Sequence, residues 1–359
     1  MDICYRASLV LALALALAFL ISGEYAQETL VPAIITFGDS GLDVGNNDYL
    51  PTKFKANYSP YGKDFLNHRP TGRFCNGKLI SDIIAETMGF KTYPPAYLSR
   101  DASGENLLIG ASFASAASGF DDKIVIANNA IPLHQQLQYF KEYKSKLAKV
   151  AGSNKSMSII KDALYLLSAG TSDFLLNYYI NPQINKIYTP DQYGSFLVTA
   201  FSSFVKDLYG LGARRLGVSS LPPLGCVPAA RALFGFLENG CVSRINDDAQ
   251  KFNNKINFTA ANLQKLLPGL KIVVFDMFKP FYDLLQTPSN YGFVEARRGC
   301  CKTETGTVET ITTTLLCNSK SPGTCTNATQ FVFWDGIHPS EAANQILADG
   351  LIVQGFSLI

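Results

Sequence analysis

Short apolar runs alternate along the chain with longer segments that have a helical pattern. The runs are apolar on both faces or nearly so, which is typical of strands covered by helices on both sides. Strands separated by helices predict a parallel, doubly wound sheet. The predicted strands are Ala33–Phe37, Asn106–Phe113, Ala163–Ser168, Arg215–Ser219 and Lys271–Phe275. The predicted helices are Gly77–Met88, Pro132–Val150, Asp191–Leu211, Val242–Leu267 and Pro339–Ile352, the last with its proline in the first turn.

A serine that follows the first predicted strand is the most informative candidate for chemistry. In a sheet of this kind the site lies at the carboxyl ends of the strands, which is where Ser40 falls. Such a serine needs a base to become nucleophilic, and the base needs a carboxylate to orient it. The chain has 3 histidines, and only His338 has a carboxylate three residues before it, Asp335. These three residues predict a serine hydrolase.

The composition is that of a globular protein with one sizeable core. The chain has 359 residues, of which 47% are hydrophobic and 17% charged. A fold with alternating strands and helices often reaches this length as one domain. The net charge of +2 and the pI near 8.0 are too mild to indicate nucleic-acid binding, so no nucleic-acid partner is expected.

Residues 1–26 are predicted to be a signal peptide. Arg6 provides the positive region, Leu9 to Ile21 the apolar region, and Glu24-Tyr-Ala26 a cleavage site. The apolar stretch is shorter than the ~20 residues of a membrane span. An uncleaved anchor is the alternative. Residues 27–359 are therefore expected to form a single secreted, extracellular domain with no integral membrane segment.

Sequons and cysteines agree with export. Two cysteines, Cys226 and Cys241, bracket a short segment and are predicted to pair. The sequons place expected N-glycans at Asn57, Asn154, Asn257 and Asn327.

Four further cysteines cluster tightly within Gly299–Thr329, directly before Asp335. They could form two disulfides, although adjacent cysteines leave the connectivity open. Zinc is the competing interpretation, but the spacing lacks C-x-x-C pairs and an oxidising compartment favours disulfides. We expect a disulfide-pinned loop that could form a wall of the site. Cys75 is then the odd cysteine, and a buried free thiol is favoured over an intermolecular bridge. The clustered cysteines are Cys300, Cys301, Cys317 and Cys325.

Several longer strings, in order along the chain, resemble the plant-type GDSL esterase/lipase family of the SGNH hydrolase superfamily. The string Phe37-Gly-Asp-Ser-Gly-Leu-Asp-Val-Gly-Asn-Asn47 resembles its first sequence block. The resemblance implies a three-layer α/β/α sandwich with a mostly parallel, flavodoxin-like central sheet. The other matching strings are Gly72–Lys78 followed by Asp82, Gly110–Gly119, Ser168–Phe174, Leu221–Cys226 and Phe333–Pro339.

The resemblance also implies a role for each site residue. Ser40 would be the nucleophile, His338 the general base and later general acid, and Asp335 the orienting carboxylate. The family's oxyanion hole consists of the nucleophile's own N–H, a glycine N–H and an asparagine side chain. The corresponding positions here are Ser40, Ala117 and Ser172.

Three positions at the site, one of them directly after the nucleophile, depart from the family pattern. Gly41 replaces the usual leucine after the nucleophile, Ala117 replaces glycine, and Ser172 replaces asparagine. An alanine N–H can still donate if the backbone needs no positive φ, and a serine hydroxyl is shorter and less directed than an amide. Losing one oxyanion donor costs ~100- to 1,000-fold in rate. The departures leave a slow or narrowly specific enzyme open.

The sequence thus predicts a secreted carboxylic ester hydrolase that forms an acyl-enzyme and needs no metal or organic cofactor. Lipid, acetylated wall-polysaccharide and phenolic esters are all compatible with it. One alternative is a catalytically weak or inactive glycoprotein of the same fold that acts in binding or structure. Another is a glycoside hydrolase with paired carboxylates drawn from Asp39, Asp173 and Asp335, although their spacing shows no pair. Asp173 follows a strand and is more typical of a loop or helix cap.

Overall fold

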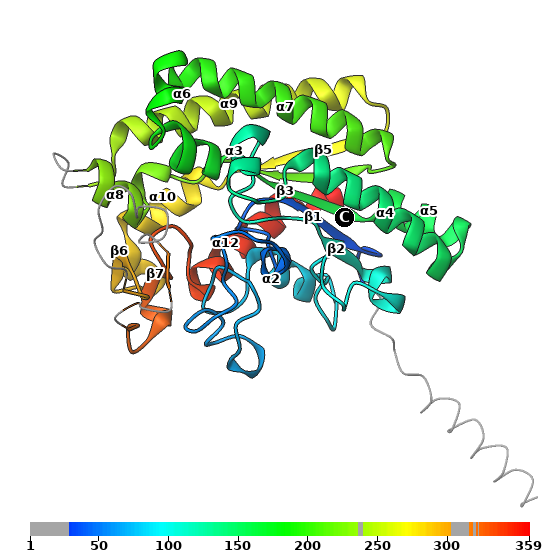
Figure 1. Cartoon of the computed structure of the whole chain (residues 1–359), viewed down its shortest axis with the longest axis horizontal. Helices are drawn as coiled ribbons and strands as arrows, with labels where there is room; N and C mark the ends of the chain where they lie inside the picture. The colour runs from blue at the N-terminus through cyan, green and yellow to red at the C-terminus, as the bar shows by residue number, and fades with distance from the viewer. Residues whose placement is uncertain (1–28, 236–239, 303–315, 319–320, 322) are drawn as a thin grey trace, which may run out of the picture.

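The computed structural model of the protein describes residues 29–235, 240–302, 316–318, 321 and 323–359. Its centre is a five-stranded parallel sheet in the order β2-β1-β3-β4-β5, which is the order of the flavodoxin-like sheet that the family resemblance implies. A separate parallel pair, β6 with β7, lies beside it (Figure 1). The strands are β1 Ile34–Gly38, β2 Gly110–Ser112, β3 Leu164–Ser168, β4 Arg215–Ser219, β5 Lys271–Phe275, β6 Glu295–Gly299 and β7 Phe331–Phe333.

Helices cover both faces of the sheet and complete three layers (Figure 1). On one face Phe37 of β1 packs its ring against Phe140 of α4 and Phe204 of α7. Helices α2 and α12, which contact each other, cover the opposite face. The helices are α2 Ile80–Thr87, α3 Asp122–Ala127, α4 Leu133–Ala151, α5 Ser153–Asp162, α6 Pro182–Ile187, α7 Pro190–Gly210, α8 Pro228–Phe234, α9 Ser243–Leu266, α10 Phe278–Gln286 and α12 Glu341–Gln354.

The α/β/α fold class is confirmed, but the strand predicted over Asn106–Phe113 is wrong in its first half. Gly104–Ile109 form a 3-10 helix, and of the predicted strand only the segment β2 pairs with β1. Gly110, at the junction, has φ +105°, and a Cβ atom there would lie 1.9 Å from the carbonyl oxygen of Ile34. Glycine is required because the backbone has a positive φ here and lies directly against β1.

The helix predicted to start at Pro339 begins at Glu341 instead. Ser340 is its N-cap and accepts a hydrogen bond from the N–H of Ala343. Pro339 forms an isolated antiparallel bridge with Phe333 and so lies in extended chain. The segment after His338 is therefore tied to β7 before the helix starts.

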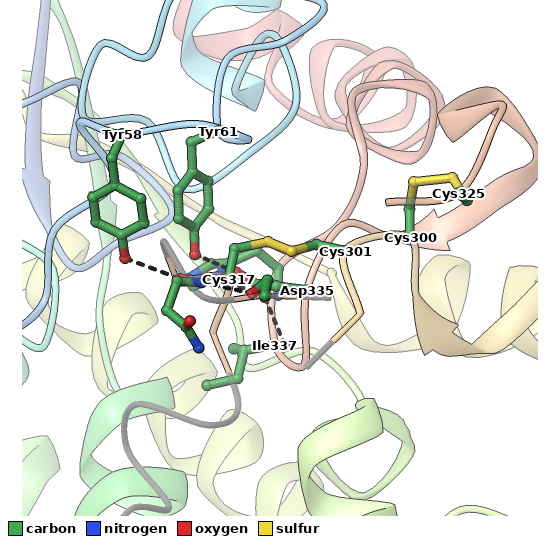
Figure 2. The surroundings of a disulfide bond; sticks show 11 residues. Tyr58, Tyr61, Cys300, Cys301, Cys317, Cys325, Asp335 and Ile337 are labelled. Atoms are coloured by element: carbon green, nitrogen blue, oxygen red, sulfur yellow. Dashed lines mark hydrogen bonds and ion pairs between the residues drawn. A yellow bond between two sulfur atoms is a disulfide. The ribbon is translucent and has the colours of Figure 1, made fainter. Parts of the chain in front are cut away.

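The cysteine predictions are confirmed in part by the described residues. Cys226 pairs with Cys241, and Cys75 is a buried free thiol. The cluster forms two disulfides, Cys300–Cys325 and Cys301–Cys317, which Figure 2 shows beside Asp335. Part of the loop between these cysteines, and the predicted signal peptide, lie outside the described residues. No helix within the described ranges is both long and apolar enough to cross a bilayer.

Candidate active site

Ser40 meets two side chains from the far end of the chain, Asp335 and His338, at the carboxyl edge of the sheet. Ser40 follows β1, whereas Asp335 and His338 follow β7. His338 Nε2 lies 2.8 Å from Ser40 Oγ, and His338 Nδ1 lies 2.9 Å from Asp335 Oδ2. The structure therefore brings together the three residues that the sequence singled out. The same geometry occurs in serine hydrolases of several unrelated folds.

A close approach between β1 and β3 places Ser40. Gly38 ends β1 with φ +120°, and a Cβ atom there would lie 1.7 Å from the carbonyl oxygen of Ser168. The buried Gln136 side chain accepts the N–H of Gly38 at 2.8 Å and donates to its carbonyl oxygen at 3.0 Å. Because both backbone groups of Gly38 are fixed, the chain leaves the strand in one direction and presents Ser40 at the edge.

Asp39 holds the turn on the other side of Ser40. Its Oδ1 accepts the N–H of Gly41 at 3.1 Å and the hydroxyl of Ser168 at 3.0 Å. Burial raises the pKa of Asp39 to about 6, against the opposing effect of these donors. The turn therefore depends on the backbone N–H of Gly41, which a residue of any type except proline supplies.

The carboxylate of Asp335 is fully buried and fixed by several donors. Its Oδ1 accepts the backbone N–H groups of Ile337 and His338, both at 2.8 Å. Its Oδ2 accepts the hydroxyl of Tyr61 at 3.0 Å, as Figure 2 shows. Burial raises the pKa of Tyr61 well above its usual value, with the charge of Asp335 adding to the effect, so the hydroxyl stays a neutral donor. The contact of Tyr61 with Asp335 could not be predicted from the sequence, because no local pattern links the two residues.

The three predicted oxyanion-hole residues line one small cavity beside the Ser40–His338 pair. Ser40, Ala117 and Ser172 contribute to its wall, and its volume is about 20 Å³. This is enough space for one water molecule, and hence for one substrate oxygen. Within the described part of the chain, the backbone N–H groups of Ser40 and Ala117 donate to no protein acceptor. The geometry leaves these donors available to a ligand.

Ala117 does need a left-handed backbone, which the sequence could not reveal. Its φ is +67°, a conformation that costs alanine roughly 1–2 kcal/mol. Two side chains of the segment that follows Ser40 hold the turn at Ala117 in place. Asp43 Oδ2 accepts the N–H of Ala116 at 2.9 Å, and Asn47 Nδ2 donates to the carbonyl oxygen of Ala116 at 3.0 Å. Asp43 and Asn47 were missed as positioning residues, although both lie in the string that carried the resemblance.

Asp173 does not face the cavity. Its carboxylate accepts the backbone N–H groups of Phe120 and Asp121, each at 2.9 Å, and burial raises its pKa to about 7. It therefore fixes the loop after Ala117, in keeping with a capping role. Asp335 is likewise occupied by protein donors. Among the residues that the structure describes, no group of three or more His, Cys, Asp or Glu side chains is placed to hold a metal ion.

Comparison with known proteins agrees with the fold. The family model of GDSL-like lipases/acylhydrolases matches residues 34–351. GDSL esterase/lipase APG of Arabidopsis thaliana is 65% identical over 359 residues, which is 100% of both chains. Another Arabidopsis thaliana protein, GDSL esterase/lipase At5g03810, is 55% identical over 339 residues, covering 94% of this chain and 95% of its own. The chain belongs to the GDSL lipase/acylhydrolase family.

Proposed function

We propose that the protein is a secreted carboxylic ester hydrolase in which Ser40, His338 and Asp335 act as a catalytic triad. The observation that carries the proposal is the continuous hydrogen-bond chain from Asp335 Oδ2 through the His338 ring to Ser40 Oγ, with distances of 2.9 and 2.8 Å. Family membership supports the reaction class, since the relatives are named esterase/lipases.

The reaction follows from this chain of hydrogen bonds. Ser40 Oγ attacks the ester carbonyl carbon while His338 Nε2 takes the hydroxyl proton, and Asp335 stabilises the imidazolium that forms. The negatively charged oxygen enters the small cavity, where the N–H groups of Ser40 and Ala117 and the Ser172 hydroxyl donate to it. The tetrahedral intermediate collapses, and His338 returns the proton to the departing alcohol. Water then attacks the acyl-enzyme with His338 again as base, releasing the acid.

Export of the protein is part of the proposal. Its support is the predicted signal peptide over residues 1–26, together with three disulfides, which persist in oxidising compartments. The asparagines of all four sequons are exposed, as attachment of glycans requires: Asn57, Asn154, Asn257 and Asn327.

A catalytically weak glycoprotein is the second candidate, and the strained backbone at Ala117 together with the serine at position 172 favours it. A fluorophosphonate probe separates the two. We expect stoichiometric labelling at Ser40 in the secreted protein, and at least a hundredfold slower labelling in His338→Gln, because the serine then lacks its base. Peptide mapping by mass spectrometry locates the label. An unlabelled wild-type protein would favour the non-catalytic candidate.

A further inference from the structure

An apolar cavity opens beside Ser40 and His338 and runs into the interior of the protein. Its volume is about 130 Å³. It lies between strands β3 and β4 of the sheet and helices α2, α10 and α12. It shares Ser40 and His338 with the small oxyanion cavity, so both cavities meet at the reacting atoms. Its inner wall consists of Leu79, Ile84, Leu166, Phe275, Phe281 and Leu351.

A second apolar cavity continues in the same direction. Its volume is about 20 Å³, and it extends to Leu164 at the start of β3 and to the C-terminal Ile359. The side chains that line both cavities therefore form the partition between them: Ile84, Leu166, Phe275 and Leu351.

Phe275 is the largest side chain of this partition, and a glycine gives it space. A Cβ atom on Gly217 of β4 would lie 2.3 Å from the Phe275 ring, so the ring occupies the space that a side chain at 217 would fill. The opposite face of the sheet is packed differently. There Phe37 contacts the rings of Phe113, Phe140 and Phe204. The apolar cavity beside Ser40 thus lies on the other face of the sheet, against β3, β4 and β5.

The distribution of polar groups indicates what this cavity takes. Its polar lining lies near the Ser40–His338 pair and the start of α12. Asn344 of α12 is part of it, and its Nδ2 donates to the carbonyl oxygen of Lys78 at 2.9 Å. The polar side chains at the carboxyl edge of the sheet are Asp39, Ser168, Thr171 and Ser219. The inner wall is aliphatic and aromatic, so it offers no donor or acceptor to a sugar or a charged group. A ligand with one polar end and an extended apolar tail matches this arrangement, because each buried methylene group gains from leaving water.

We propose that this cavity binds the unbranched aliphatic acyl chain of the ester, and that Phe275 and Leu351 form the floor that limits chain length. The proposal rests on the proposed esterase function and adds its substrate class. The ester carbonyl lies at Ser40 with its oxygen in the small cavity, while the acyl chain passes along β3 towards the partition.

The strand spacing sets the expected chain length. The first cavity follows β3 from Ser168 to Leu166, two residue steps of about 3.3 Å each, or roughly 7 Å. This is close to the length of an extended hexanoyl chain. Removing the partition would extend the path to Leu164, four steps or roughly 13 Å, which is close to an extended decanoyl chain.

The test is kcat/KM for p-nitrophenyl acetate, butyrate, hexanoate, octanoate, decanoate and laurate. For the wild-type protein we expect kcat/KM to rise by up to about fourfold per added methylene group as far as hexanoate or octanoate, and then to fall. Phe275→Ala moves the optimum to decanoate or longer. Leu351→Ala does the same where Phe275→Ala does not fold. The matched control is Phe204→Ala, which removes an equal ring from the opposite face and keeps the wild-type optimum.

Two further measurements separate the possible failures. Ethyl hexanoate and hexyl acetate are isomers, and we expect the first to be hydrolysed at least tenfold faster. The reverse order would place the alcohol, not the acyl chain, in the cavity and overturn the proposal.

Calorimetric binding of octanoate to Ser40→Ala needs no hydrolysis, and we expect Leu351→Phe in that background to weaken it at least tenfold. Binding without hydrolysis by wild type would overturn the esterase function alone. Equal hydrolysis of all chain lengths, with no octanoate binding, would overturn the acyl cavity alone.

Discussion

Replacing Asp335 by asparagine is expected to lower kcat for p-nitrophenyl butyrate by about 10⁴-fold, as the same change does in a well-studied serine protease. The amide oxygen can still accept the N–H groups of Ile337 and His338, so the local fold is retained. The amide nitrogen then takes the place of Oδ2, 2.9 Å from His338 Nδ1, and donates to it instead of accepting; only the amide oxygen, 3.0 Å from Nδ1, can still accept its N–H. A ring that accepts from the amide carries its proton on Nε2, which faces Ser40 and can no longer act as a base, and the neutral amide does not stabilise the imidazolium.

The matched control for this prediction is Tyr61→Phe. It removes only the 3.0 Å hydrogen bond to Asp335 Oδ2 and leaves the carboxylate, the histidine and the aromatic packing in place. We expect a fall in kcat of about tenfold or less, because this hydrogen bond is present in the ground state as well as in the transition state. Both variants are compared at equal folded concentration by circular dichroism. An Asp335→Asn protein that keeps about a tenth or more of wild-type kcat would contradict the role assigned to Asp335.

Replacing Arg73 by methionine is expected to lower the free energy of unfolding by about 3–5 kcal/mol. Arg73 forms a bidentate pair with Asp82, with distances of 2.8 Å from Nε and 2.7 Å from Nη2, and the two side chains are only 8% and 2% exposed. Methionine preserves the apolar stem but leaves the Asp82 carboxylate buried without its cation. The pair also bears on the site, because Phe74, next in the chain, lies with its ring 5.1 Å from that of His338.

Lys78→Met is the matched control, because it removes a cation from the same segment of the chain. The Lys78–Glu86 pair is equally short, at 2.8 Å, but its side chains are 30% and 41% exposed. Solvent screening limits its loss to about 1 kcal/mol or less. Urea unfolding measures both values. The double variant Arg73→Met/Asp82→Leu should recover most of the loss. Equal effects of the two single variants would show that the buried pair adds nothing beyond a surface pair.

The sequence predicted the elements whose signal is local. The strands β1 and β3 are buried almost throughout, and β4 and β5 are buried or half-buried apart from Lys271, so each appears as a short apolar run, and their bounds match within a residue. The run before Ser112 is equally apolar, but its first part forms a 3-10 helix between Gly104 and Gly110, which both have a positive φ. Apolar composition alone cannot distinguish these two outcomes.

The residues of the candidate site also fall into those with a local sequence signal and those without one. Asp335 and His338 are three residues apart, so their pairing could be predicted from spacing, as could the position of Ser40 after a strand. Tyr61 reaches Asp335 across 274 residues, and this contact has no sequence pattern. The alanine at position 117 could be named from the sequence, but its left-handed backbone is set by the tertiary contacts of Asp43 and Asn47.

Hydrolysis of p-nitrophenyl butyrate by the secreted, glycosylated protein and its Ser40→Ala variant tests the central claim most directly. We predict that the wild-type protein hydrolyses the ester and that Ser40→Ala lowers kcat by at least ~10⁴-fold, because the Ser40 hydroxyl is, among the described residues, the side-chain oxygen that His338 Nε2 contacts. Ser145→Ala, which removes an exposed hydroxyl from α4, should keep the wild-type rate. Equal rates for Ser40→Ala and wild type would contradict the assignment of Ser40 as the nucleophile.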